Sequence, residues 1–232
     1  YPAYAYISGQ VDDRSLERFI DSFLAKSRDS IKPISTQCVQ KEAKEVKRVD
    51  ENMDVNQGKL CLGFRTNIDP CSPDYYPLVV YNGILGGDTN SKLFRNVREK
   101  ASLAYYAQSV LEKYKGLMII MSGIEAENRG KAEKIILEQV EDMKKGNLSE
   151  ADLKAAKNAL ETGTRAMQDS QGAIVDFFMS QNLTNCEDDF ETMTEKFKSV
   201  TLEDVVRVAQ KVQLDTVYFL KPDGSENKEG KL

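Results

Sequence analysis

Two strand-like runs in the middle of the chain constrain its fold most. Residues 102–112 and 116–124 each have strand length, and the connector between them is short enough for a β-hairpin. From Asn128 onward the sequence turns helical, with apolar residues recurring at helical spacing on one face. A hairpin combined with such helices predicts an α+β fold.

The predicted sheet contains three further strands, at residues 3–8, 58–66 and 214–220. The second alternates apolar and other residues, the period-two pattern of a half-buried strand. The last has apolar side chains on both faces, which predicts that it returns to the sheet. We expect a mixed, largely antiparallel sheet with helices packed on one face. Residues 1–221 are predicted to form one domain, and residues 222–232 a flexible tail.

Capping residues predict where several helices begin and end. Ser149 with Asp152, and Thr201 with Asp204, resemble capping boxes. Gly86 and Gly87 are predicted to end the helix that precedes them. Near the N-terminus, Asp12 or Asp13 can cap a helix with one apolar face, formed by Leu16, Phe19, Ile20, Phe23 and Leu24.

Composition excludes several function classes. The 232 residues include no histidine, which excludes Ser-His, Cys-His and His-ligated zinc mechanisms within the chain itself. A net charge of −5 without a basic cluster argues against a nucleic-acid surface, and no apolar run is long enough to span a membrane. Four cysteines without C-x-x-C spacing predict reduced, mostly buried thiols in a cytoplasmic protein rather than a disulfide framework. The missing initial methionine suggests a piece of a longer polypeptide.

Residues 84–106, ILGGDTNSKLFRNVREKASLAYY, combine two glycines, small polar residues, basic residues and a tyrosine pair more closely than any other stretch of the chain. The glycines of this stretch match neither phosphate-loop pattern, which favours a turn between helices. Arg98 and Tyr105 are predicted to lie at one end of the sheet, where they can donate hydrogen bonds to a peptide carbonyl or an oxyanion. The other interpretation is an arginine favoured by the helix dipole beside a half-buried strand tyrosine. The residues alone favour this second, structural role.

The same stretch resembles the second-domain signature of the insulinase (pitrilysin) family of zinc peptidases. The resemblance continues in residues 4–20, 123–160 and 200–220, and so covers most of residues 1–220. It is closest to bacterial members that lack a working zinc motif. The family's inverted zinc motif, H-x-x-E-H, belongs to its first domain and is absent here, since the chain contains no histidine.

The resemblance places Arg98 and Tyr105 at positions that hold substrate across the cleft from zinc. Tyr106 adds an ambiguity, because a one-residue shift of register would exchange the two tyrosines. The implied function is the non-catalytic half of a peptidase clamshell, which holds a peptide or unfolded polypeptide for a zinc-bearing half in the same longer chain or in a partner subunit. The alternative is a purely structural or scaffolding subunit. No metal or other cofactor is expected in this chain, and some apolar surface should be exposed near the sheet end that carries Tyr105.

Overall fold

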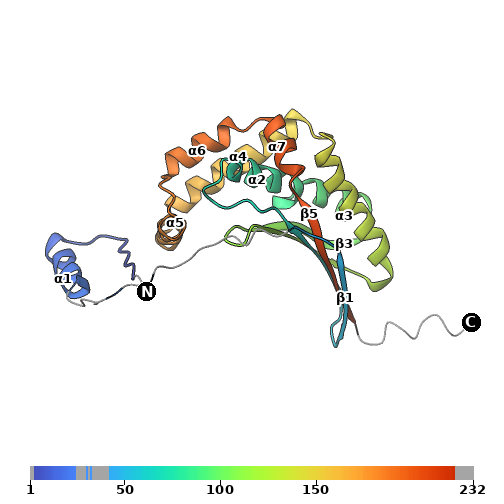
Figure 1. The fold of residues 1–232 in the computed structure, drawn as a ribbon, viewed down its shortest axis with the longest axis horizontal. Helices are drawn as coiled ribbons and strands as arrows, with labels where there is room; N and C mark the ends of the chain where they lie inside the picture. The colour runs from blue at the N-terminus through green and yellow to red at the C-terminus, as the bar shows by residue number, and fades with distance from the viewer. Residues whose placement is uncertain (1–2, 25–29, 31, 33–41, 223–232) are drawn as a thin grey trace, which may run out of the picture.

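A five-stranded sheet covered by helices on one face forms the centre of the molecule, which confirms the predicted α+β class (Figure 1). The structure, a computed structural model, describes residues 3–24, 30, 32 and 42–222. The strand order is β1-β5-β2-β4-β3, and every neighbouring pair is antiparallel except β1 and β5. The strands are β1 (Lys47–Met53), β2 (Gly58–Arg65), β3 (Ala104–Glu112), β4 (Leu117–Ile124) and β5 (Gln213–Pro222).

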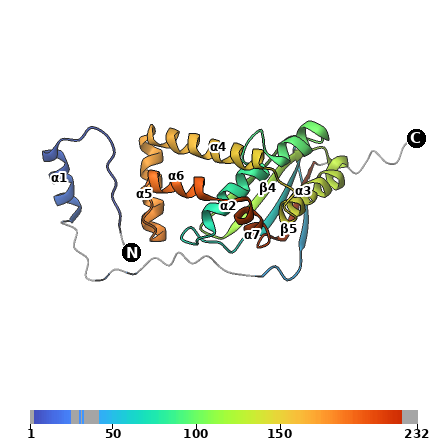
Figure 2. The ribbon, with the colours of Figure 1, turned by 90° about the horizontal axis from the view of Figure 1, so that it is seen from above.

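The helices that follow β2 gather over the same face of the sheet, as Figures 1 and 2 show. Two of them, η1 and η2, contain π-helical turns, and η3 is a single 3₁₀ turn. Helix α1 (Asp13–Leu24) lies apart from this layer. The others are α2 (Tyr75–Asn82), η1 (Gly83–Gly87), η2 (Phe94–Lys100), η3 (Ala126–Asn128), α3 (Arg129–Lys144), α4 (Glu150–Gln168), α5 (Gln171–Thr184), α6 (Phe190–Ser199) and α7 (Leu202–Ala209).

The core lies between the sheet and the helix layer. Along β2, Leu60, Leu62 and Phe64 are buried toward the helices, as their alternation predicts, because successive strand side chains point to opposite faces. Val217 and Phe219 of β5 continue this buried face. The helices contribute a complementary set of buried side chains, which includes Leu78, Tyr81, Ala132, Ile136, Val140, Met143, Val205 and Val208.

Both predicted capping boxes are present. The Ser149 hydroxyl accepts a hydrogen bond from the Asp152 backbone N–H, and the Asp152 carboxylate accepts one from the Ser149 backbone at the start of α4. Thr201 and Asp204 repeat the arrangement at the start of α7. These side chains satisfy backbone donors that the first helical turn leaves unpaired.

The strand predicted at residues 3–8 is wrong, since these residues form no strand in the structure. The position beside β5 in the sheet is occupied by β1, whose residues pair in parallel with Thr216 to Pro222. A strand needs a partner edge for its backbone N–H and C=O groups, and its side-chain pattern alone does not supply one. Residues 223–232 of the predicted tail lie outside the described residues.

The prediction of reduced cysteines is wrong for one pair, because Cys71 and Cys186 form a disulfide. The loop after β2 carries Cys71, and the left-handed residue Asn185 turns the chain into Cys186 directly after α5. The two Cα atoms lie 5.8 Å apart although 115 positions separate them along the chain. Cys61 is a free, half-buried thiol on β2, and Cys38 lies outside the described residues.

Candidate functional site

The double-glycine turn packs against the edge of β3. A Cβ atom added to Gly86 would lie 2.5 Å from the Ser109 backbone nitrogen, a distance that real Cβ contacts do not reach. The Ser109 hydroxyl also donates to the Asn82 carbonyl, at 3.3 Å. The glycine is therefore required for close approach of two backbones, in agreement with a structural role for the turn rather than a phosphate loop.

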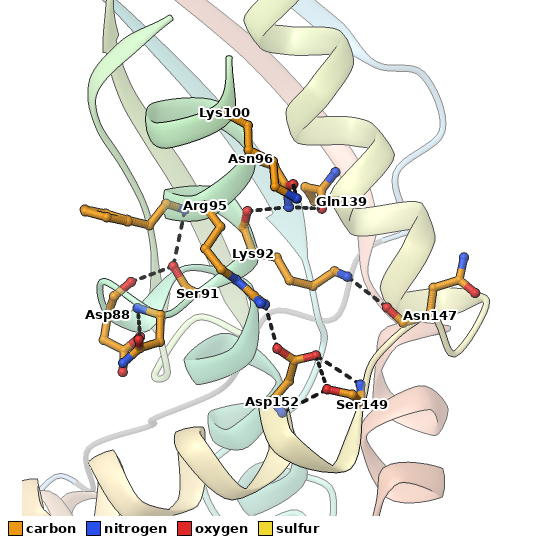
Figure 3. A network of polar contacts seen from close by, with 12 residues as sticks. Asp88, Ser91, Lys92, Arg95, Asn96, Lys100, Gln139, Asn147, Ser149 and Asp152 are labelled. Carbon is orange, nitrogen blue, oxygen red and sulfur yellow. Dashed lines mark hydrogen bonds and ion pairs between the residues drawn. The ribbon is translucent and has the colours of Figure 1, made fainter. Parts of the chain in front are cut away.

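The polar residues after this turn bind other parts of the same molecule (Figure 3). The Asp88 carboxylate accepts from the Asn90 backbone N–H at 2.7 Å, and the Ser91 hydroxyl donates to the Asp88 carbonyl at 2.6 Å. Lys92 is buried, and its ammonium donates to the Asn147 carbonyl at 2.8 Å in the turn before α4. These contacts fix the start of the helix that leads to Arg98.

The middle of that helix is tied to α3 and α4, again in Figure 3. Arg95 donates to the Asp152 carboxylate at 2.6 Å, and Asn96 donates to the Gln139 side-chain oxygen at 2.8 Å. Burial raises the pKa of Asp152, but hydrogen bonds from Ser149 and Arg95 outweigh it and hold that pKa below its usual value. The capping residue of α4 therefore also anchors η2, since a single carboxylate serves both helices.

Arg98 differs from Arg95, which lies one turn earlier on the same helix. Arg98 is exposed, and its guanidinium lies 4.6 Å from the centre of the Phe94 ring. This is a cation–π contact with a neighbour on the same helix. Among the described residues it has neither a hydrogen-bonding partner nor an ion-pair partner. Five N–H donors of this guanidinium are thus free for a ligand.

Tyr105 is the extra residue of an irregularity at the start of β3. Ala104 pairs with Ile124 and Tyr106 pairs with Gly123, which leaves Tyr105 between them without a partner in β4. Such a bulge redirects a side chain. Tyr105 is 70% exposed, and its hydroxyl has no hydrogen-bonding partner among the described residues.

The neighbouring tyrosine is placed differently, which bears on the register ambiguity. The Tyr106 ring lies so close to Gly123 that an added Cβ there would be 2.6 Å from a ring carbon. Its partial burial raises the pKa of the Tyr106 phenol. In the structure Tyr106 therefore rests on the open face of the sheet, and Tyr105 is the more accessible of the two.

A backbone contact holds Arg98 and Tyr105 near each other without a direct interaction between their side chains. The Leu103 backbone N–H donates to the Val97 carbonyl at 3.1 Å, which turns the chain from η2 straight into β3. Ser102 adopts a positive φ of 50° in this turn. Both residues thus belong to the end of the sheet where β3 and β2 begin, as the sequence predicted.

The face of the sheet away from the helices exposes apolar side chains. Val49, Val110 and Ile119 are each between 36% and 46% exposed, and Val110 is paired with Ile119 across β3 and β4. Met53, at the end of β1, is 46% exposed as well. The apolar surface expected near Tyr105 is thus spread along the open face of the sheet instead.

A pocket of about 570 Å³ lies beside the Cys71–Cys186 disulfide, at the end of the sheet opposite Arg98 and Tyr105. Its polar groups bind one another: the Tyr76 hydroxyl donates to Asp188 at 2.5 Å, and Lys196 pairs with Asp188 at 2.5 Å. Burial and the Asp188 carboxylate raise the pKa of the Tyr76 phenol. Because these groups are already paired, the pocket is a weaker candidate than the Arg98–Tyr105 end.

Residues suited to a zinc ion are not found in the part of the chain that the structure describes. No group of three or more His, Cys, Asp or Glu side chains there could hold a metal ion, and the sequence has no histidine. The residues therefore do not fit a catalytic zinc, which takes three protein ligands that commonly include histidine. Over the same residues, no helix is both long and apolar enough to cross a membrane.

The fold and the site define an α+β domain whose described part carries no metal site of its own. Residues 3–160 match the family model described as the Peptidase M16 inactive domain. The chain is also 39% identical over 216 residues to the probable inactive metalloprotease YmfF of Bacillus subtilis (strain 168), an alignment that covers 93% of this chain and 50% of that protein. The chain therefore belongs to the M16 peptidase family, which confirms the resemblance to insulinase-type peptidases.

Solved structures share the fold of this chain. A conserved protein from Enterococcus faecalis V583 is 30% identical, with a TM-score of 0.75 over 79% of this chain and 44% of that chain. A peptidase M16 inactive domain from Pseudomonas fluorescens is 20% identical and shares the fold, with a TM-score of 0.75 over 91% of this chain and 52% of that chain. The chain spans about half the length of the curated relatives it matches, 50% and 48%.

Proposed function

We propose that this chain is the non-catalytic half of an M16-type peptidase clamshell. It holds a peptide or unfolded polypeptide for a zinc-bearing half, located in the same longer chain or in a partner subunit. The chain's match to only half of each curated relative supports such a two-part molecule. Its own role is to bind and orient substrate, and the reacting metal belongs to the other half.

One observation carries the proposal: among the described residues, Arg98 and Tyr105 have no polar partners, whereas Lys92, Arg95 and Asn96 of the same segment do. Arg98 and Tyr105 are held at the same end of the sheet, with a guanidinium and a phenol free to donate. Donors of this kind fit a peptide carbonyl or the oxyanion formed on it during cleavage.

The structural or scaffolding alternative makes the opposite prediction for the same residues. In this alternative the 91–105 segment contributes only to the stability of the fold. The name of the relative YmfF, a probable inactive metalloprotease, is compatible with such a role. Under that alternative Arg98 and Tyr105 affect stability weakly or not at all, and peptide affinity is unchanged by their substitution. Peptide affinity therefore separates the two functions.

The test compares two pairs of matched variants in the complete assembly. We expect Arg98→Ala and Tyr105→Phe to weaken binding of a fluorescein-labelled unfolded polypeptide by about 1 to 3 kcal/mol, with the larger loss for the charged donor. Melting temperature should hardly change, because neither side chain has an internal polar partner. Fluorescence anisotropy and thermal unfolding measure the two quantities.

Arg95→Ala and Tyr106→Phe are the controls. Arg95→Ala should lower stability by about 1 kcal/mol, because it removes the bond to Asp152, and should leave peptide affinity close to that of the parent protein. Tyr106→Phe should affect neither quantity strongly. Equal peptide affinity in the parent protein and in both Arg98 and Tyr105 variants would reject the binding role.

A further inference from the structure

Helix α1 presents an apolar face that no described residue covers. Leu16, Phe19, Ile20 and Phe23 recur at intervals of three and four residues and so form one stripe. Each is between 38% and 42% exposed. Figures 1 and 2 both show α1 apart from the sheet and its helix layer. A stripe of four large apolar side chains is typical of a helix that packs against another body.

Within the described residues, the helix-covered face of the sheet has no vacant place for this helix. The apolar face of β5 that points toward the helix layer is already buried, with Val217 fully buried and Phe219 2% exposed. The edge of β5 is occupied by β1. The segment before α1 contacts the remainder of the molecule through a polar bond, from the Asn182 amide of α5 to the Tyr6 hydroxyl at 2.7 Å. That contact leaves the apolar stripe free.

The polar side of α1 indicates which kind of partner the stripe fits. It carries Arg14 and Arg18 together with Asp13, Glu17 and Asp21, so that basic and acidic charges are mixed. A helix that lies on an anionic membrane has a predominantly basic polar face. The mixed charges therefore favour a protein surface over a lipid surface.

We propose that α1 docks by this apolar stripe on the other half of the two-part molecule. The inference rests on the proposed function, in that it requires that half to exist. The partner is chosen because about half of each curated relative lies beyond the match to this chain. Residues 25–46 separate α1 from β1, so that α1 is attached to the main domain through a long intervening segment.

Hydrogen exchange tests this docking without reference to peptide binding. Amide exchange of residues 13–24 is compared between the isolated 232-residue chain and the complete assembly, read by mass spectrometry. We expect exchange in this segment to be at least about tenfold slower in the assembly, because docking suppresses local opening of the helix. Phe19→Asp should remove that difference, since it places a charge on the stripe.

Arg18→Asp is the matched control, as it places the same residue on the polar side of the same helix. It should leave the protection in the assembly intact. Because the parent protein alone supplies the main comparison, the test still decides if Phe19→Asp fails to assemble.

Three results would overturn the docking proposal. Equal protection in the isolated chain and the assembly would show that α1 packs on its own domain. Protection in the isolated chain that rises with concentration, together with a dimer in sedimentation, would identify a second copy as the partner. Fast exchange in both states would show that nothing covers the stripe. Normal α1 protection combined with no peptide binding would instead reject the proposed function and leave the docking in place.

Discussion

Residues that look alike in the 91–106 segment have different roles because their surroundings differ. Arg95 and Arg98 lie on one helix, yet Arg95 is bound to Asp152 and Arg98 is free of polar partners among the described residues. Tyr105 and Tyr106 are adjacent, yet the bulge exposes the first and settles the second over Gly123. The sequence indicated Arg98 and Tyr105 through a family resemblance. Tertiary contacts are what distinguish the roles of these two residues from those of Arg95 and Tyr106.

Gly86 gives a prediction at the scale of one residue. Gly86→Ala should lower the free energy of unfolding by about 1 to 3 kcal/mol, because the new methyl group must displace the β3 backbone at Ser109. Gly163→Ala is the control, since an added Cβ there meets nothing within 4 Å and the position is inside α4. That change should raise stability by up to about 1 kcal/mol. Urea unfolding measures both, and a neutral Gly86→Ala would contradict the close approach.

Strands and helices with a strong local pattern were predictable, and those that depend on a partner were not. The alternation in β2 is visible in the sequence because one of its faces is buried. Strand β1 has no such pattern, as all its residues are exposed. It is held by pairing with β5 and by the ion pairs Arg48–Glu133 and Arg129–Asp50 with α3. Residues 3–8 have a strand-like pattern but find no sheet edge.

The contacts between helices could not be predicted from the sequence either, because they too depend on partners that are distant in the chain. Both capping boxes are local, and both were predicted. The partners of Lys92 and Asn96 lie at Asn147 and Gln139, 55 and 43 positions away. Spacing along a chain carries no information about such distances.

Asp74 gives a prediction that concerns two helices. It precedes α2 and binds Arg207 of α7, at 2.9 Å, and Lys211 just after that helix. The hydrogen bond from Lys211 is the largest influence and lowers the pKa of Asp74 below its ordinary 3.8, against the opposing effect of burial. Because the folded-state pKa is the lower one, this stabilisation is fully present above the unfolded-state value and is lost as pH falls through the folded-state value.

Asp74→Asn should therefore destabilise the protein at pH 7 by about 1 kcal/mol, a modest figure because both cationic partners are about half exposed. It should also reduce the loss of stability between about pH 4 and pH 2. Urea unfolding of both proteins across this range measures the effect. Parallel stability curves for the two proteins would show that Asp74 contributes nothing to the acid response.

At the scale of the whole molecule, the described residues form a sheet and a helix layer with two surfaces that suggest partners. One is the open face of the sheet, with Val49, Val110 and Ile119 exposed, and the other is the apolar stripe of α1. The Cys71–Cys186 disulfide joins the loop after β2 to the end of α5. Its pairing was not predictable, because the spacing of cysteines in sequence does not determine which of them meet.

The absence of histidine leads to a prediction for the purified chain. It should retain no stoichiometric zinc after a chelator wash, because the sequence offers no imidazole and the described residues hold no metal-binding cluster. Elemental analysis by mass spectrometry measures the zinc content. One zinc ion per chain after washing would show that the chain builds a site of its own.

A double-mutant cycle on peptide affinity bears most directly on the proposed function. It compares the parent assembly, Arg98→Ala, Tyr105→Phe and the double variant, with the Kd of one labelled unfolded polypeptide measured for each. If both side chains contact the same group of the bound peptide, each single change weakens binding and their effects are not additive, with a coupling energy of at least about 0.5 kcal/mol. Four equal Kd values would contradict the substrate-binding role. Effects that simply add would contradict joint action on one peptide group.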